Sequence, residues 1–174
     1  MLYDNPILRT DSYKFSHWLQ YPEGVTNQFN YLESRGGKYP ETLFFGLQYY
    51  LKEYLTRRIT TDMVKEADTF AKLHGVPFNR DGWMYIAREL GGRIPLKIKA
   101  VPEGYLVPTH KALMTVEATD PKCFWVVGWF ETELMRIWYP ITVATNSFYC
   151  KRSIYESLVK TSDNPDAEIM FKLP

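Results

Sequence analysis

The segment from 123 to 138 is the feature that most limits how this chain can fold. Written as a helix, it carries apolar side chains around almost its whole circumference. A helix that is hydrophobic on all sides is normally buried, so we expect this one to lie beneath a second domain or subunit. Asp120 followed by Pro121 is typical of a helix start, and we expect Tyr139-Pro140 to end the helix.

Apolar residues at helical spacing predict several further helices. The first begins at Thr10 or Asp11 and ends by Gln20, because Tyr21 precedes a proline and is disfavoured in a helix. The others are expected over 41–57, 61–74, 81–90 and 143–160. Gly75 is a typical residue just after a helix and predicts the end of the 61–74 segment.

Alternating apolar and polar residues predict strands in other parts of the chain. They are expected over 25–34, 96–101, 105–107 and 113–116, with another opening at 169–173. Pro102-Glu103-Gly104 is typical of a turn, so 105–107 is expected to return alongside 96–101. The fold class predicted is therefore α+β, with helices and an antiparallel sheet over 96–116.

Composition excludes several classes of protein but names no function. The 21 Lys and Arg residues against 20 Asp and Glu residues give a net charge of +1, which argues against nucleic acid or an anionic membrane as a partner. No apolar run reaches the roughly 18 residues of a membrane span. Two cysteines form no disulfide framework, so a reducing, cytoplasmic setting is expected.

Asp11 and Tyr13, at the start of the first predicted helix, are candidates for a ligand site. Backbone N–H groups are free in a first helical turn, and the helix dipole is positive there. Asp11 is either a helix cap or an acceptor for a polar ligand group. Tyr13 is either a packing residue or an aromatic surface for a flat ligand. Local sequence alone leaves both alternatives open.

Arg35 is the second candidate, because it stands where a predicted strand ends in Gly36-Gly37. An arginine fork suits phosphate oxygens, and glycine permits close backbone approach, although a turn with a solvated arginine is also possible. The three histidines are too far apart in sequence to resemble a metal site, and neither cysteine has an evident base beside it. No glycine-rich phosphate loop of the common types is present.

Longer blocks of the sequence resemble one enzyme family. Thr10-Asp11-Ser12-Tyr13-Lys14, followed by Gln20-Tyr21-Pro22, is similar to the opening of the nicotinamide phosphoribosyltransferases. The blocks 33–35, 41–49, 98–104 and 138–147 resemble later segments of that family, in the same order. Because these ordered blocks cover nearly the whole chain, the resemblance is far more specific than any single motif.

The resemblance implies a function. Members of this family make nicotinamide mononucleotide and pyrophosphate from nicotinamide and phosphoribosyl pyrophosphate, using Mg²⁺, in NAD salvage. They act as homodimers with each active site at the subunit boundary. Carried over by matching residues, Asp11 and Tyr13 are expected to line the nicotinamide pocket of the other subunit, Tyr13 by stacking on the ring. Arg35 is expected near the phosphates, also across the dimer.

The family also implies that most of the active site lies beyond this chain. We expect the N-terminal α+β domain of a type II phosphoribosyltransferase over residues 1–140 and the start of a truncated α/β barrel over 141–174. The family's catalytic histidine and most phosphate ligands fall in that barrel. No catalytic residue and no metal ligand are therefore expected here, and activity would require a complementary C-terminal barrel half or a full-length subunit.

Two questions remain open at this level. The last apolar segment is either an edge strand or the beginning of something larger. The chain is either part of the enzyme or a non-catalytic binding or dimerisation module acting on a full-length enzyme, with an inactive remnant as a further alternative. Retention of Asp11, Tyr13 and Arg35 favours the enzymatic interpretation.

Overall fold

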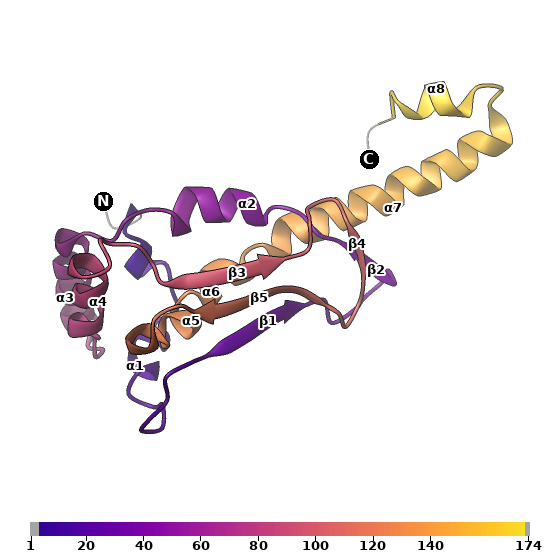
Figure 1. The fold of residues 1–174 in the computed structure, drawn as a ribbon. Coiled ribbons are helices and arrows are strands. Elements are labelled where there is room, and N and C mark those ends of the chain that lie inside the picture. Colours follow the sequence, from indigo (N-terminus) through magenta and orange to yellow (C-terminus); the bar gives the residue numbers. More distant parts are fainter. Residues whose placement is uncertain (1–3, 173–174) are drawn as a thin grey trace.

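A three-stranded antiparallel sheet forms the middle of the protein (Figure 1). The computed structural model describes residues 4–172. The central strand β5 (Ala112–Ala118) pairs with β1 (Phe29–Glu33) on one side and with β3 (Leu96–Ala100) on the other. The α+β class and the antiparallel sheet predicted from alternation are confirmed.

The predicted return of 105–107 alongside β3 is wrong. Strand β4 (Leu106–Pro108) instead pairs antiparallel with β2 (Glu41–Leu43), in a second, two-stranded sheet. The turn at Gly104 explains the difference, since its φ of 91° is in the left-handed region and its N–H donates to the carbonyl of Phe44 at 2.8 Å. This bond directs the chain toward β2 and away from β3.

The predicted helix over 41–57 is correct only in its second half. Glu41–Leu43 is strand β2, and Gly46, with a φ of 98°, separates it from α2 (Leu47–Tyr50). One π-helical turn, Leu51–Leu55, continues α2. The strand is favoured because its residues find a partner in β4, a pairing that helical spacing within 41–57 could not reveal.

Helices α3 (Thr61–His74) and α4 (Arg80–Arg88) form one end of the protein (Figure 1). The bounds predicted for α3 are confirmed, because local signals set both ends. The hydroxyl of Thr60 accepts from the backbone N–H of Met63, and Gly75 takes the left-handed conformation after the last turn.

The apolar segment is buried as predicted, but it is not one helix. It forms a short 3₁₀ turn (Pro121–Cys123), α5 (Val126–Trp129) and α6 (Glu131–Met135), with Asp120 capping the first turn through the N–H of Lys122. The segment contributes to both hydrophobic clusters of the core. The first cluster includes Trp83 of α4, and the second includes Val116 of β5. Elements of this chain itself therefore cover it.

The N-terminal helix is shorter than predicted. Helix α1 comprises only Lys14–His17, preceded by hydrogen-bonded turns and a 3₁₀ turn at Pro6–Leu8. Phe15, on α1, packs against Trp129 with ring centroids 4.8 Å apart. This contact seats the N-terminal segment directly on the buried α5–α6 segment.

Helix α7 (Trp138–Thr161) and helix α8 (Pro165–Ile169) project from the end opposite α3 and α4 (Figure 1). Pro140 was expected to end a helix, but it lies in the first turn of α7, where its missing N–H is not needed. α7 crosses position 140, and the division into domains at that position stays a prediction. Within 4–172, no helix is both long and apolar enough to cross a membrane.

The strand predicted over 169–173 is wrong for residues 169–172, the part of it that the structure describes. Ile169 is the last residue of α8, and 170–171 form a turn. Asn164 caps α8 by accepting from the N–H of Ala167, and Pro165 occupies the first turn, so local signals favour a helix. Residues 173 and 174 lie outside the described residues.

Candidate functional site

Asp11 lies in the turns that lead into α1, and its carboxylate does not cap that helix. The backbone carbonyl of Asp11 accepts from the N–H of Lys14 at 3.0 Å. Its side-chain Oδ2 accepts from the hydroxyl of Thr132 on α6 at 2.7 Å. The capping alternative for Asp11 is therefore wrong, and the side chain is held by a distant helix instead.

Tyr13 presents its ring to the surface. The side chain is 56% exposed, so the alternative that it is a packing residue is not supported. Its ring lies 5.1 Å from the ring of His17, and the ammonium of Lys14 lies 5.2 Å from the centroid. Desolvation, and then the neighbouring Asp11 carboxylate, raise the pKa of the Tyr13 phenol above its usual value. The phenol therefore stays protonated at neutral pH and can donate a hydrogen bond.

Three successive residues of α6 hold the segment that carries Asp11 and Tyr13. Glu131 pairs with Lys14, Thr132 donates to Asp11, and Glu133 binds the guanidinium of Arg9 with an Oε2–Nε distance of 2.9 Å. Lys14 and Glu133 are almost completely buried. Buried charges require partners, so these pairs fix the segment on α6.

Sequence reasoning missed these α6 residues. The sequence did contain a signal for them. The segment from 123 to 138 was predicted to be buried and contains two glutamates, at 131 and 133, and buried carboxylates need cationic partners. Local sequence could not identify the partners, which lie more than 100 positions away.

Arg35 lies in the loop that follows β1. The register between β1 and β5 shifts between Leu32 and Glu33, as in a β-bulge, just before this loop. Gly36, next to Arg35, has a φ of 94°, a conformation that side chains rarely adopt. The arginine side chain is exposed.

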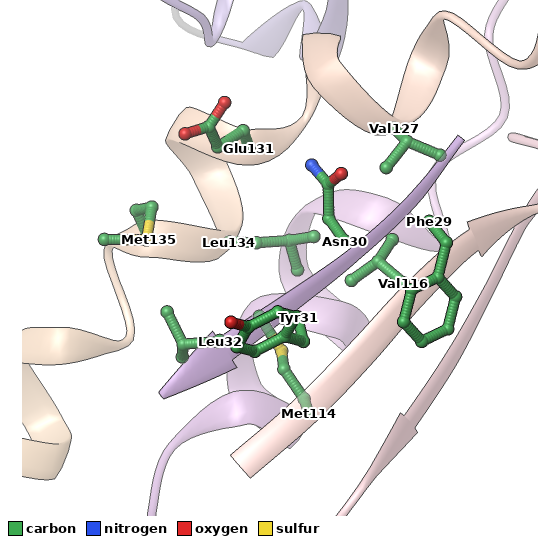
Figure 2. A pocket seen from close by; sticks show the side chains of 10 residues that line it. All are labelled: Phe29, Asn30, Tyr31, Leu32, Met114, Val116, Val127, Glu131, Leu134 and Met135. Atoms are coloured by element: carbon green, nitrogen blue, oxygen red, sulfur yellow. The ribbon is translucent and has the colours of Figure 1, made fainter. Parts of the chain in front are cut away.

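Arg35 lines a groove of about 980 Å³ that runs from β1 past α6 to α7. Glu131 and Met135 line the same groove and also a smaller pocket of about 260 Å³ between β1 and α6. Figure 2 shows the apolar side chains of this pocket, with Glu131 on its α6 side. No hydrogen bond or ion pair within 4–172 joins Arg35 to Asp11 or Tyr13. Glu131 pairs with Lys14, next to Tyr13, and also lines the groove that Arg35 lines.

Comparison with known proteins identifies the family. A family model described as nicotinamide phosphoribosyltransferase, N-terminal domain, matches residues 5–98, which is more than half of the chain. The chain belongs to the nicotinamide phosphoribosyltransferase family. The resemblance that the sequence blocks indicated is thereby confirmed.

Two curated relatives carry the name nicotinamide phosphoribosyltransferase. The protein of Xanthomonas campestris pv. campestris (strain 8004) is 52% identical over 170 residues, covering 98% of this chain and 36% of the relative. The protein of Acinetobacter baylyi (strain ATCC 33305 / BD413 / ADP1) is 29% identical over 178 residues, covering 90% of this chain and 34% of the relative. This chain thus spans about a third of the length of these nicotinamide phosphoribosyltransferases.

The part that matches the nicotinamide phosphoribosyltransferase domain model contains all three predicted site residues: Asp11, Tyr13 and Arg35. Helix α6, which holds the first two, lies after residue 98 and so outside that match. The alignment with the Xanthomonas relative extends over nearly the whole chain. The roles of these residues stay predictions.

All three histidines lie beside the segments that carry the site residues. The ring of His17 lies 5.1 Å from that of Tyr13, the backbone N–H of His110 donates to the carbonyl of Ser34 at 2.8 Å, and the third is His74. Its Nε2 lies 2.7 Å from the hydroxyl of Ser12, between Asp11 and Tyr13 in sequence. Burial raises the pKa of the Cys123 thiol to about 12. Nowhere in the described part do three His, Cys, Asp or Glu side chains come together as metal ligands.

Proposed function

We propose that this chain forms the N-terminal part of a nicotinamide phosphoribosyltransferase, which makes nicotinamide mononucleotide and pyrophosphate from nicotinamide and phosphoribosyl pyrophosphate. The family match over residues 5–98 carries the proposal. The segment that carries Asp11 and Tyr13 is held against α6, and Glu131 of α6 lines the same groove as Arg35, which supports the proposal.

Tyr13 and Asp11 are suited to recognise nicotinamide. The exposed tyrosine ring can stack on a planar pyridine. The carboxylate of Asp11 is an acceptor, and only one of its oxygens is engaged by Thr132, so the other can accept from the Tyr13 phenol or from a ligand amide. We propose that both residues reach a pocket completed by another subunit.

Arg35 is suited to the phosphates of the second substrate. Its guanidinium is exposed on the wall of a groove large enough for a sugar phosphate, and the arginine fork matches phosphate oxygens. The nearby Lys38, which lines the same groove, adds a second positive charge. We propose that the groove holds phosphoribosyl pyrophosphate at the subunit boundary.

In the proposed reaction, the bond between the anomeric carbon and pyrophosphate breaks, and the pyridine nitrogen bonds to that carbon. Pyrophosphate leaves with the electron pair, and the transition state has oxocarbenium character. Tyr13 and Asp11 would orient the pyridine, and Arg35 would offset the charge that grows on the leaving group.

The complete enzyme requires further parts in this proposal. The relatives are about three times as long as the matched region, so we propose that a C-terminal barrel half or a full-length subunit supplies the catalytic residues and the site for Mg²⁺. We further propose a homodimer, because the ring of Tyr13 and the side chain of Arg35 are both exposed on the surface. Two free cysteines suit a cytoplasmic location.

A fusion protein tests the proposal. This chain would be joined to the part of the Xanthomonas relative that it does not match, and nicotinamide mononucleotide would be measured by mass spectrometry. We expect product, and we expect Tyr13→Leu to raise the KM for nicotinamide about tenfold through loss of stacking. Tyr105→Leu, at another exposed tyrosine, is the matched control. A stable, dimeric fusion that makes no product would contradict the proposed function.

A further inference from the structure

We propose that Thr132 is a positioning residue: its hydroxyl orients the carboxylate of Asp11, and through it the phenol of Tyr13, for binding of the pyridine substrate. The inference rests on the proposed function and extends it to a residue of α6. Thr132 touches neither substrate in this proposal. It acts by determining which oxygen of Asp11 is free and where that oxygen points.

The direction of the hydrogen bond is determined by chemistry. An ionised carboxylate only accepts, so the Thr132 hydroxyl donates to Oδ2 of Asp11 across 2.7 Å. A bond of this kind to a charged acceptor is stronger than one between neutral groups. With Oδ2 engaged, the rotation of the carboxylate is restricted, and Oδ1 remains available to the Tyr13 phenol or to a ligand amide.

The neighbours of Thr132 make α6 a firm support for this bond. Glu133, directly after it, is buried and binds both Arg9 and Arg136, each at 2.9 Å. Leu134 and Phe130, on either side, are buried in the core. These contacts do not involve the Thr132 hydroxyl, so α6 should keep its place when that hydroxyl is removed.

Other side chains anchor the segment on both sides of Asp11 without reaching its carboxylate. Directly before it, the Thr10 hydroxyl donates to the backbone carbonyl of Trp129 at 2.8 Å. Ser12 contacts His74 at the exposed end of α3, and Tyr13 is largely exposed. Lys14 is anchored by Glu131, but it follows the two site residues. Thr132 is therefore the contact that reaches the carboxylate of Asp11 itself.

The experiment compares Thr132→Val with Thr132→Ser in the active fusion. Valine keeps the shape of threonine and removes the hydroxyl, whereas serine keeps the hydroxyl. We expect valine to raise the KM for nicotinamide about tenfold, the effect of losing one hydrogen bond to a charged group. The KM for phosphoribosyl pyrophosphate should stay within about twofold, and serine should restore the KM for nicotinamide.

The matched control is Thr69→Val on α3, where the exposed hydroxyl donates only to the backbone carbonyl of Lys65. This variant should leave both KM values unchanged. If Thr132→Val behaves like the control, or raises both KM values equally, the proposed role of Thr132 is wrong. If serine fails to restore binding, the hydroxyl is not the group responsible.

A second measurement, made on the 174-residue chain, separates this inference from the proposed function. The N–H groups of Lys14 and Phe15 donate to the carbonyls of Asp11 and Ser12, so their hydrogen exchange reports the order of the turn. Thr132→Val should speed exchange at both amides severalfold, and Thr132→Ser and Thr69→Val should not. An inactive wild-type fusion would contradict the proposed function alone. Unchanged exchange in Thr132→Val would overturn the positioning role.

Discussion

The guanidinium of Arg9 and the carboxylate of Glu133 form a bidentate ion pair, although the two residues are 124 positions apart in the sequence. Glu133 is 1% exposed, and Arg136 binds it as well. The Arg9 guanidinium also lies over the ring of Tyr54, in the π-helical turn, with Cζ 3.7 Å from the ring centroid. This network ties three segments together and holds α6 next to the candidate site.

Replacing Arg9 by methionine should destabilise the protein. Methionine keeps much of the apolar stem but leaves a buried carboxylate with one partner, Arg136, so we expect the free energy of unfolding to fall by about 2 kcal/mol. Urea unfolding measures this change. Arg152→Met, which breaks the exposed pair with Glu156, is the control and should cost less than about 0.5 kcal/mol. Equal losses would show that the Glu133 network is not stabilising.

Gly46 should not tolerate alanine. A Cβ there would lie 2.6 Å from Cγ of Pro140 in the first turn of α7, and φ is 98°. Gly24, with a φ of 83° and open space around it, provides a control that carries the backbone strain without the clash. We expect Gly46→Ala to lower the free energy of unfolding by about 1–3 kcal/mol more than Gly24→Ala. Similar losses of unfolding free energy for the two variants would mean that the contact between Gly46 and Pro140 yields easily.

The two cysteines should differ in reactivity. Burial raises the pKa of the Cys123 thiol to about 12, so essentially no thiolate forms there between pH 7 and pH 9. Cys150 is partly exposed. We expect a thiol reagent to modify one cysteine in the folded chain and both in denaturant, with Cys150→Ser abolishing the folded-state reaction by mass spectrometry. Modification of Cys123 in the folded Cys150→Ser variant would indicate that this part of the core opens.

Arg35→Ala should weaken use of the phosphorylated substrate in the active fusion. Loss of a charge-assisted phosphate contact is expected to raise the KM for phosphoribosyl pyrophosphate about tenfold, with little change in the KM for nicotinamide. Steady-state kinetics measures both. Arg152→Ala, at an exposed arginine on α7 that does not line the groove, should change neither value. An unchanged KM for phosphoribosyl pyrophosphate in Arg35→Ala would remove Arg35 from the proposed site.

Part of the fold could be predicted because its signals are local. Helix α3 begins after a capping Thr60 and ends before Gly75, and both signals lie within the segment they delimit. Most residues of strands β1 and β3 alternate between half-buried and exposed positions, and 114–117 of β5 alternate between buried and half-buried ones. Errors arose where a partner decided the outcome, as in Glu41–Leu43, which β4 holds as a strand.

Some residues of the candidate site could likewise be predicted from the sequence, and others could not. Asp11, Tyr13 and Arg35 were identified by residue type, position and family resemblance, and their roles remain to be measured. Thr132 and Glu131 were not identified, since a threonine and a glutamate in a buried segment indicate no particular partner. Only the packing of α1 on α5 and α6 brings them to Asp11 and Lys14.

The amino-acid sequence by itself determined the α+β class, the family and the side chains that offer an aromatic ring, a carboxylate and a guanidinium. Those properties depend on covalent structure and on spacing along a few turns of chain. The tertiary structure alone decided which strand β4 joins, that the apolar segment breaks into short helices, and that α6 holds Asp11. These outcomes depend on contacts between residues about 60 to more than 120 positions apart, whose geometry exists only once the core has packed.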